Sequence, residues 1–373
     1  MRYYIITGEA SGDLHASNLM RELKRLDANA SFRCWGGERM KEHGCELVKH
    51  YRETAYMGFT DVALHLGKIR NLIAYCKRDI LSWRPDVLVL VDYPGFNLRM
   101  AKFARRNGFR VIYYISPQVW AWNPSRVQKI KARIDHMIVI LPFEEEFYAQ
   151  YDYPVEYVGH PLLDAIDPVY QDLYPSFRSV YSLDDRPIIA ILPGSRRQEI
   201  RRILPVMLSV VPQFADYQFV IAGLSGLSST FYKAFMDSHP VRIVYDQTYP
   251  LLRNAAAAMV TSGTATLETA LHDVPQVICY RGEALSYLIA KKLIRVPYIG
   301  LVNLIMGEEI ATELIQDQMN PENLLSELNQ ILNEGSRRDR MLTDYQRLKS
   351  KLGGRGASER AARSIFKYLQ VMS

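Results

Sequence analysis

The chain has 373 residues, of which 48% are hydrophobic and 23% are charged, and its formal net charge is +6. This length suits two domains of ordinary size, and the composition is typical of a soluble globular protein. The mild positive charge fits a partner that is an acidic small molecule or an anionic membrane surface. The sequence lacks the long basic blocks and the zinc-finger or RNA-binding signatures of nucleic-acid-binding proteins, so we expect no nucleic-acid partner.

Cysteine spacing and hydropathy indicate the cellular compartment in which the protein is expected. The four cysteines occur without CxxC spacing, which favours reduced thiols over disulfides or a zinc site. No signal peptide precedes the first strand-like residues, and no apolar run reaches the ~18 residues that span a bilayer. We therefore expect a cytoplasmic protein, or one that rests on a membrane from the cytoplasmic side.

The first strand is expected at residues 3–6, followed by a loop of small residues at 7–13 and an amphipathic helix. The loop carries Glu9, Ser11 and Asp13, but it is not a GxGxxG fingerprint, which disfavours a nicotinamide-dependent enzyme. Such a loop still lies at the carboxyl edge of a parallel sheet, where α/β proteins bind ligands.

A second strand is expected at residues 31–35, and apolar residues then recur at helical spacing over 64–80. One interpretation is a helix packed on the sheet. The other is a membrane-surface patch, in which basic residues surround apolar ones. The patch would consist of Met57, Phe59, Leu66 and Ile73 with Lys68, Arg70, Lys77 and Arg78.

Residues 87–91, VLVLV, are the clearest strand, because a continuous apolar run suits a parallel strand covered on both faces. Asp92 follows at the tip of this strand, where α/β folds place chemistry, and is therefore a candidate catalytic carboxylate. The alternative is that Asp92 only caps the turn before Asn97.

Further strands are expected at 111–115, 136–141 and 155–158. The first of these leads into a loop with Ser116 and Trp120, and the last is followed by His160. Strands that alternate with helical stretches indicate a doubly wound parallel sheet for this half of the chain.

Residues 165–185 are rich in Asp, Pro and Ser and are interpreted as a linker. A second alternating set of strands is expected at 187–192, 218–222, 241–245, 256–261 and 275–280, before a helical last quarter. We expect a first domain at 1–165, a linker at 166–186, a second domain at 187–350, and a C-terminal helix within 351–373 that packs back on the first domain.

Residues 193–196, Pro-Gly-Ser-Arg, form the turn between the first strand of this second set and a helix. Gly194 lets a ligand approach the backbone, the N–H groups of the first helical turn point at it, and Arg196 has bidentate reach to phosphate. Taken alone, this stretch favours an ordinary turn with a surface arginine.

A similar turn occurs at Ser262, Gly263 and Thr264, after another apolar run. Glu268 would lie about one turn into the following helix, where a carboxylate could accept both hydroxyls of a ribose. Two such turns suggest one nucleotide, held by its phosphates at the first and by its sugar at the second. The alternative for Glu268 is a solvated or capping glutamate.

Two Rossmann-like halves with a nucleotide site in the second correspond to the GT-B glycosyltransferase plan, with parallel sheets that face a central cleft. The motifs are more specific, and as a set they resemble the lipid-A-disaccharide synthase family. They are spread over most of the chain in the family's order: residues 8–13 (GEASGD), 116–122 (SPQVWAW), 141–144 (LPFE), 158–161 (VGHP), 192–196 (LPGSR) and 262–268 (SGTATLE).

The resemblance implies transfer of 2,3-diacylglucosamine from UDP-2,3-diacylglucosamine to 2,3-diacylglucosamine 1-phosphate. The products would be the β-1,6-linked lipid A disaccharide 1-phosphate and UDP. Members of the family are inverting, need no metal or other cofactor, and lie peripherally on the inner membrane. A homodimer is left open.

The resemblance also assigns site residues, with Asp92 as the base for the acceptor hydroxyl. The UDP-sugar would be bound by Gly194, Ser195, Arg196, Ser262, Gly263, Thr264, Glu268, Tyr280, Arg281, Asn303 and Gln316. The acceptor side would be formed by Glu9, Ser11, Asp13, Met57, Asn97, Ser116, Trp120 and His160. The chain departs from the family pattern at Gly95, Asn123 and Val302.

Two alternatives remain open at this point. One is another GT-B enzyme, such as a UDP-GlcNAc 2-epimerase or the lipid II glycosyltransferase, and UDP release with each candidate acceptor distinguishes these. The other is a sugar-nucleotide or lipid binding module without turnover, which Asp92 disfavours.

Overall fold

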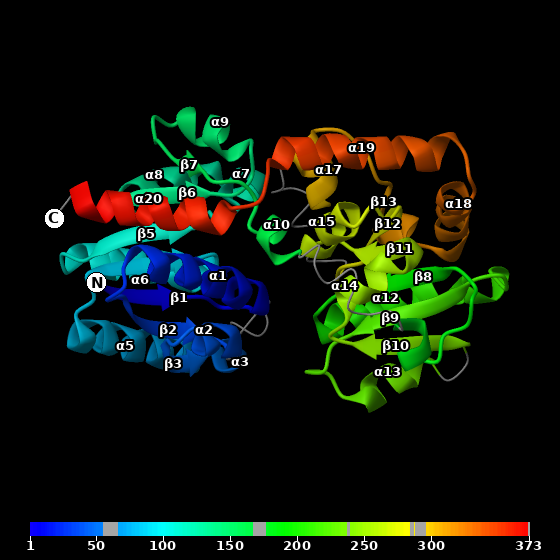
Figure 1. Cartoon of the computed structure of the whole chain (residues 1–373), viewed down its shortest axis with the longest axis horizontal. Helices are drawn as coiled ribbons and strands as arrows, with labels where there is room; N and C mark the ends of the chain where they lie inside the picture. Colours follow the sequence, from blue (N-terminus) through cyan, green and yellow to red (C-terminus); the bar gives the residue numbers. More distant parts are fainter. Residues whose placement is uncertain (55–65, 167–176, 237–238, 284–286, 288–295, 372–373) are drawn as a thin grey trace. The chain divides into compact units, whose positions relative to one another are not determined.

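The structure is a computed structural model that describes residues 1–54, 66–166, 177–236, 239–283, 287 and 296–371 (Figure 1). The chain divides into two compact units. The first comprises Met1–Ala165 together with Leu352–Ser373, and the second comprises Ile166–Lys351. Within the described residues, no helix combines the length and hydropathy that crossing a membrane requires.

A seven-stranded parallel sheet forms the centre of the first unit, in the order β3-β2-β1-β4-β5-β6-β7. Its strands are β1 (Arg2–Ile6), β2 (Ser31–Gly36), β3 (Glu46–His50), β4 (Val87–Val91), β5 (Arg110–Tyr114), β6 (His136–Val139) and β7 (Glu156–Tyr157). The strand order reverses between β1 and β4, which are hydrogen-bonded neighbours. In open α/β sheets such a reversal marks the place where ligands bind.

Helices cover both faces of this sheet, because successive apolar residues of each central strand point to opposite faces and both faces must be buried. Tyr4, Leu88 and Tyr113 on one face belong to a buried core with residues of α5 and α6. The helices are α1 (Ala10–Leu26), α2 (Glu38–Glu42), α3 (Tyr51–Thr54), α5 (Leu66–Trp83), α6 (Pro94–Arg106), α7 (Val119–Trp122), η1 (Pro124–Arg126), α8 (Val127–Lys131), α9 (Glu144–Ala149), α10 (Leu162–Ala165) and α20 (Ala357–Val371).

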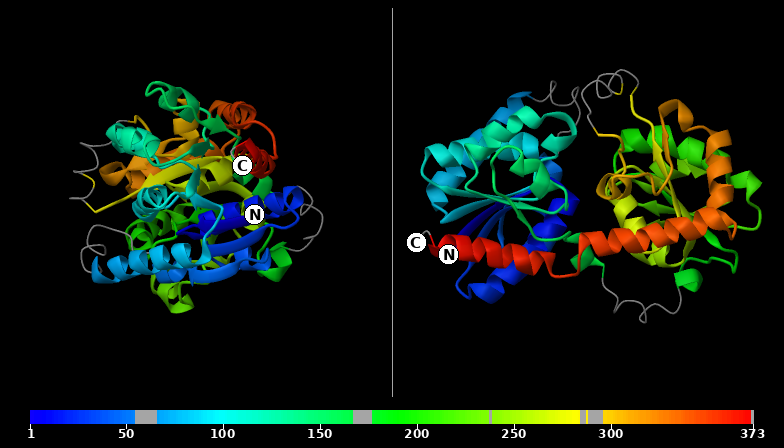
Figure 2. Two further views of the ribbon diagram at one scale, coloured as in Figure 1. Left: turned by 90° about the vertical axis from the view of Figure 1, so that its left-hand side faces the viewer. Right: turned by 90° about the horizontal axis from the view of Figure 1, so that it is seen from above.

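The last helix, α20, belongs to the first unit although it ends the chain. It packs along α1, as the red and blue helices show in Figures 1 and 2. The Asp164 carboxylate accepts hydrogen bonds from the backbone N–H groups of Gly356 (2.6 Å) and Ser358 (2.7 Å). The start of α20 is therefore tied to the end of α10.

The second unit contains a six-stranded parallel sheet in the order β10-β9-β8-β11-β12-β13. Its strands are β8 (Ile188–Leu192), β9 (Gln218–Gly223), β10 (Val241–Tyr245), β11 (Ala255–Thr261), β12 (Gln276–Tyr280) and β13 (Glu313–Ile315). Its helices are α11 (Phe177–Val180), α12 (Arg197–Ser209), η3 (Val211–Gln213), α13 (Ser229–Met236), α14 (Thr248–Arg253), α15 (Thr264–Leu271), α17 (Leu301–Met306), η4 (Gln316–Gln318), α18 (Pro321–Leu332) and α19 (Ser336–Leu352). The order reverses between β8 and β11.

The predicted fold class, two α/β units built on parallel sheets, is confirmed. Two strands were not predicted, β3 and β13, and both lie at sheet edges. β3 is half-buried and β13 has only three residues, so neither shows the continuous apolar run of a central strand. The strand expected at 136–141 ends at Val139.

Candidate active site

The loops after β1 and β4 meet at the carboxyl edge of the first sheet. Asp92 and Tyr93, which follow β4, both have left-handed backbone conformations, with φ of 47° and 50°. A Cβ atom on Gly8, in the loop after β1, would lie 2.3 Å from ring carbons of Tyr93. Only glycine fits there, so the two loops pack closely against each other at the point where the strand order reverses.

Asp92 has the electrostatic environment of a base. Burial raises the pKa of its carboxyl to about 6, and the nearby Glu9 carboxylate contributes to the rise. Glu9 is the residue before α1. A carboxylate with this pKa is ionised at neutral pH yet binds a proton more readily than an ordinary aspartate.

Two predicted acceptor-side residues have their polar atoms directed at the backbone. Asp13 is buried and accepts hydrogen bonds from the N–H groups of Gly37 (2.7 Å), Arg39 (3.2 Å) and Met40 (3.2 Å). The Asn97 side-chain amide donates to the carbonyl oxygen of Asp92 at 2.7 Å. Both residues therefore shape the loops at the sheet edge.

A buried polar cluster follows β5 and β6. The Ser116 hydroxyl lies 2.7 Å from that of Tyr148, and the Trp120 indole N–H donates to Glu144 at 3.3 Å. Glu144 also accepts from the N–H of Leu141 at 2.9 Å, and burial raises the pKa of its carboxyl to about 7. Ser116 and Trp120 thus belong to one network that joins two loops.

His160 and Ser11 lie on other elements, the loop after β7 and helix α1. His160 is buried, its Nδ1 accepts the N–H of Leu162 at 3.2 Å, and burial lowers its pKa to about 3. A histidine with this pKa is neutral and a poor proton acceptor. Ser11 lies in the first turn of α1, and Met57 falls outside the described residues.

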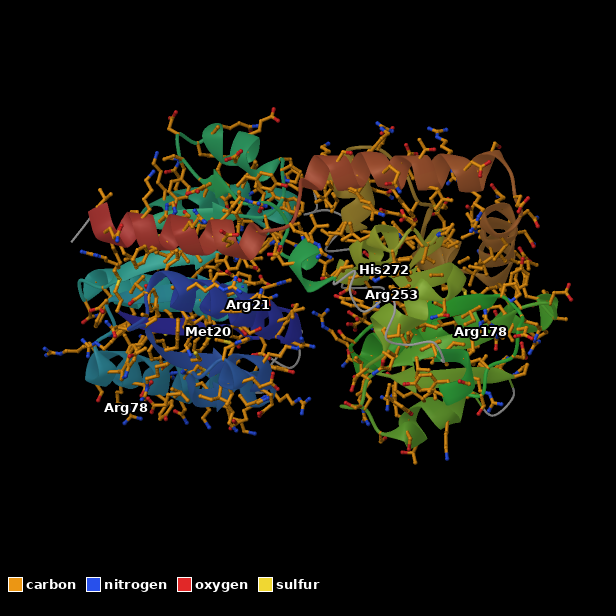
Figure 3. All side chains as sticks on the ribbon, in the orientation of Figure 1. Met20, Arg21, Arg78, Arg178, Arg253 and His272 are labelled. Atoms are coloured by element: carbon orange, nitrogen blue, oxygen red, sulfur yellow. The ribbon has the colours of Figure 1, made fainter. Side chains whose placement is uncertain are left out.

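The proposed membrane patch is only partly supported by α5. Ile73 packs against the core of the first unit, whereas Lys68, Arg70 and Arg78 are exposed (Arg78 is labelled in Figure 3). Lys77 lies over the ring of Phe103 at 5.3 Å. The apolar side of α5 is therefore used for core packing, and Met57 and Phe59 fall outside the described residues.

In the second unit, the turn after β8 has the form expected of an anion site. Gly194 has a φ of 100°, Arg196 is the N-cap of α12, and the helix begins at Arg197. The Arg196 guanidinium pairs with Glu199 at 2.9 Å and is half-exposed. Ser195 is exposed beside it. The turn thus combines a helix N-terminus, an open backbone and a cation.

The turn after β11 lies beside that anion site. Thr261 carbon atoms lie 3.4 Å from a Cβ position on Gly194, so the two turns are neighbours. The Ser262 hydroxyl donates to the carbonyl oxygen of Ile299 at 2.9 Å. Gly263 is the N-cap of α15, and the helix begins at Thr264, the last residue of the predicted turn.

Glu268 lies one turn into α15 and is held by α14. Its carboxylate accepts the hydroxyl of Tyr249 at 2.9 Å, and burial raises its pKa. His272 and Arg253 are both labelled in Figure 3. The Tyr249 and His272 rings are 5.2 Å apart, and the charge of Arg253 acts on His272. Glu268 is therefore a half-buried carboxylate that the Tyr249 hydroxyl orients.

The loops after β12 and β13 complete this edge. Burial raises the pKa of Tyr280, and the charges of Glu199 and Arg196 also act on its hydroxyl group. Gln316 accepts the N–H of Gly282 at 2.7 Å, and Arg281 is exposed. The structure therefore brings the predicted β8, β11 and β12 residues together.

Asn303 does not join that group through its side chain. It is fully buried, its amide donates to Ala311 (2.8 Å) and Glu313 (2.9 Å), and its oxygen accepts from Ile310 and Ala311. Glu313 in turn accepts the N–H of Gly300 at 2.9 Å. These contacts hold the loop before α17.

Several partner residues were missed by sequence analysis. They are Tyr113, Tyr148, Glu199, Tyr249 and Glu313. Glu199 alone had a usable signal, because it follows Arg196 by three residues, a spacing at which side chains meet on one face of a helix. The others bond to residues distant in sequence.

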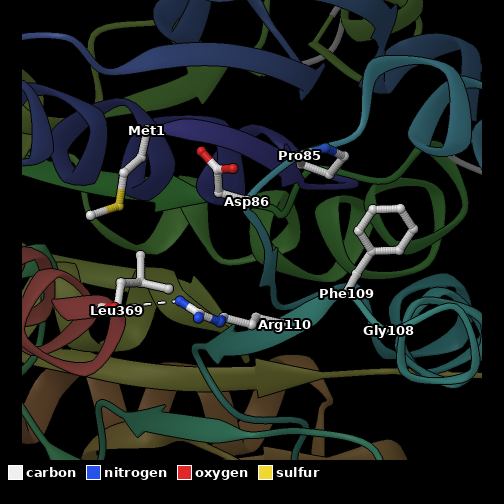
Figure 4. Close-up of a pocket in the computed structure, with 7 residues that line it drawn as sticks. All are labelled: Met1, Pro85, Asp86, Gly108, Phe109, Arg110 and Leu369. Carbon is white, nitrogen blue, oxygen red and sulfur yellow. Dashed lines mark hydrogen bonds between the residues drawn. The ribbon is translucent and has the colours of Figure 1, made fainter. Parts of the chain in front are cut away.

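One pocket in the first unit lies away from these loops (Figure 4). Its volume is about 370 Å³, and it is lined by Met1, Pro85, Asp86, Gly108, Phe109, Arg110 and Leu369. Most of these residues precede or begin β1, β4 and β5, so the pocket lies at the amino edge of the sheet. It is not part of the candidate site.

Sequence comparison agrees with the residue motifs. A family model described as lipid-A-disaccharide synthetase matches residues 3–366. The chain is 40% identical to the lipid-A-disaccharide synthase of Geobacter metallireducens over 99% of this chain and 97% of the relative. It is 41% identical to that of Syntrophus aciditrophicus, over 96% and 95%.

Solved structures show a similar architecture at low sequence identity. The UDP-GlcNAc 2-epimerase of Neisseria meningitidis is 11% identical and has a TM-score of 0.69, over 98% of this chain and 100% of the epimerase. The calicheamicin glycosyltransferase is 16% identical and has a TM-score of 0.60, over 99% and 98%. These likenesses show the GT-B fold.

Proposed function

The chain belongs to the lipid-A-disaccharide synthase family, and from that premise we propose which of its residues carry the reaction. The family assigns it a glycosyltransferase activity: 2,3-diacylglucosamine passes from UDP-2,3-diacylglucosamine to 2,3-diacylglucosamine 1-phosphate. The products are the lipid A disaccharide 1-phosphate and UDP. The epimerase alternative is not favoured, because the epimerases resemble this chain in fold only.

The second unit is the donor domain in this proposal. The diphosphate of the donor binds at Gly194, Ser195 and Arg196, where backbone N–H groups and a guanidinium meet. Glu268 holds the ribose hydroxyls. Tyr280, Arg281 and Gln316 contact the donor from the neighbouring loops, together with the turn at Ser262, Gly263 and Thr264, while Asn303 keeps the loop before α17 in place.

The first unit is the acceptor domain, and Asp92 is its base. The 6-hydroxyl oxygen of the acceptor attacks the anomeric carbon of the donor, and the bond from that carbon to the diphosphate oxygen breaks. The proton passes to Asp92, and UDP leaves with the electron pair. A single displacement of this kind inverts the anomeric configuration. General-base assistance contributes roughly 10²–10⁴-fold to the rate.

The other acceptor-side residues divide into two groups. Glu9 tunes Asp92 by its charge, and Ser11 and Met57 are proposed to contact the acceptor. Asp13, Asn97, Ser116, Trp120 and His160 shape the loops that surround it, since their polar atoms bond within the protein.

The charge that develops on UDP is proposed to be neutralised by Arg196 and the α12 N-terminus, without a metal or other cofactor. The site of action is proposed to be the cytoplasmic face of the inner membrane, because the acceptor carries acyl chains and α5 exposes basic residues. A homodimer is compatible with this arrangement.

The observation that carries the proposal is the convergence of the predicted residues on the two strand-order reversals, Asp92 at one and Arg196 at the other. The test is incubation of the purified chain with both lipid substrates and mass spectrometry of the product. We expect the tetraacyl disaccharide 1-phosphate with release of UDP. Epimerised UDP-GlcNAc in a parallel assay, without disaccharide, would contradict the proposal.

A further inference from the structure

Asp92 sits on a backbone turn that needs support. Both Asp92 and Tyr93 have positive φ values, 47° and 50°, and neither is glycine. Non-glycine residues adopt this conformation rarely, and two in succession persist only where surrounding contacts enforce it. Strained turns of this kind often occur at functional sites because they direct a side chain.

Two buried donors converge on the same carbonyl oxygen of this turn. The Tyr113 hydroxyl, from β5, donates to the oxygen of Asp92 at 2.5 Å. The Asn97 amide, from α6, donates to it at 2.7 Å and lies 3.3 Å from the oxygens of Val91 and Ile6. Both donor residues are fully buried. The carbonyl is thus clamped from the neighbouring strand and from the following helix.

We propose that Tyr113 is a positioning residue for Asp92: its hydroxyl holds the Asp92 carbonyl oxygen and so fixes the backbone from which the carboxylate extends. The role rests on the proposed function of Asp92 as the base. A displacement of about 1 Å at a reacting group is enough to slow an enzyme substantially.

The chemistry of the phenol suits this task. Burial, and then the charge of Asp92, raise the pKa of Tyr113 well above its ordinary value, so the hydroxyl remains a donor. Among the described residues, the titratable groups that act most on Asp92 and Tyr113 are Glu9 in the loop after β1 and Tyr148 of α9. None of these is positively charged.

The adjacent residue provides a matched control. Tyr114 is also fully buried on β5, but successive strand residues point to opposite faces, and its hydroxyl lies towards Ser358 and Asp164 at the α20 side. Tyr113→Phe and Tyr114→Phe therefore each remove one buried hydroxyl from the same strand, and only the first removes a contact to Asp92.

The test compares kcat, both KM values, the pH profile and Tm of the two variants. We expect Tyr113→Phe to lower kcat by about tenfold with both KM values within about twofold, and to move the acid limb of the pH profile. Tyr114→Phe should retain the kcat and pH profile of the wild type. Asn97→Ala should likewise lower kcat and leave both KM values nearly unchanged. It serves as the test variant if Tyr113→Phe does not fold.

A double variant separates this proposal from the role of Asp92. If Tyr113 acts through Asp92, Asp92→Asn/Tyr113→Phe should be no slower than Asp92→Asn alone. Wild-type kcat and pH profile in Tyr113→Phe, or an equal loss in Tyr114→Phe, would overturn the positioning role. A wild-type rate in Asp92→Asn alone would instead overturn the base.

Discussion

At the scale of single residues, the mechanism depends on the desolvation of the Asp92 carboxyl group, which is only partly exposed. The end of β4 and the left-handed turn position this carboxylate, and the charge of the neighbouring Glu9 helps to raise its pKa. Of the other base candidates in the first unit, Asp13 bonds to three backbone N–H groups and His160 is buried and neutral. Glu9 is the remaining rival.

Replacing Asp92 by Asn distinguishes a base from a turn cap. Asn keeps the shape and one acceptor oxygen but takes up no proton. We expect kcat to fall by at least about 10²-fold, with UDP affinity and Tm near those of the wild type. Steady-state kinetics and calorimetry provide the measurements. A kcat within a few-fold of the wild type would favour the cap and direct attention to Glu9.

The pH dependence of the rate follows from the raised pKa of Asp92. The base acts only when deprotonated, so kcat/KM should fall as the pH drops through about 6. Glu9→Gln removes a nearby negative charge, lowers the Asp92 pKa, and should move that fall to lower pH. Glu42→Gln, an exposed carboxylate on α2, is the control. An unmoved acid limb in Glu9→Gln would contradict the coupling.

Glu268 should contribute to binding more than to catalysis. If it holds the ribose equally in the ground and transition states, Glu268→Ala raises the donor KM with little change in kcat. Tyr249→Phe, which removes the hydroxyl that orients Glu268, should produce a smaller change in the same direction. Calorimetric UDP affinity is the measurement, with exposed Glu322→Ala as the control. Normal UDP affinity in Glu268→Ala would leave only a structural role.

At the scale of elements, the start of α20 is held by the Asp164 side chain. Asp164 accepts two backbone N–H groups at the start of this helix, and α20 packs along α1. Such capping contacts are worth about 1 kcal/mol each. α1 itself begins at the Glu9 loop, so the packing of α20 supports an element of the candidate site.

Asp164→Ala should therefore loosen the last helix. We expect a fall in Tm of about 2–4 °C per kcal/mol lost, together with faster hydrogen exchange in α20. Glu42→Ala, at an exposed position of α2, is the matched control and should leave both unchanged. Unaltered exchange in α20 would show that its other contacts, such as the packing on α1 and the hydrogen bond from Arg360 to the Val158 carbonyl oxygen, are enough to hold it.

At the scale of the whole molecule, the remaining question is how a protein with these two units reaches a lipid acceptor. The exposed basic residues of α5 are the part of the proposed patch that the described residues support, while Ile73 is used in the core. Each basic residue near an anionic surface contributes about 1 kcal/mol to binding.

Charge removal on α5 tests this surface. Lys68→Gln/Arg70→Gln/Arg78→Gln should weaken sedimentation with anionic vesicles, and added salt should weaken the wild type in the same way. The control changes three exposed basic residues elsewhere, Lys129, Lys233 and Arg242. Equal vesicle binding by the α5 variant and the wild type would refute the patch.

Local patterns in the sequence are enough to predict the fold class and the positions of the main loops. Strand β4 and the turn after β8 are both readable because a buried apolar run and a Gly-containing turn are local signals. Parallel strands then bring their carboxyl ends to one edge, so the local pattern is enough to select Asp92 and Arg196 as candidates. Edge strands β3 and β13 escape prediction because they lack that apolar signal.

The contacts that those residues make depend on how the whole chain folds. Asp13 bonds to Gly37 across 24 positions, Tyr113 to Asp92 across 21, and Asp164 to Gly356 across 192. Such partners are set by strand order and helix packing, which no short stretch of sequence encodes. The raised pKa of Asp92 is of the same kind, because desolvation is a property of everything that surrounds the carboxyl group in the folded chain.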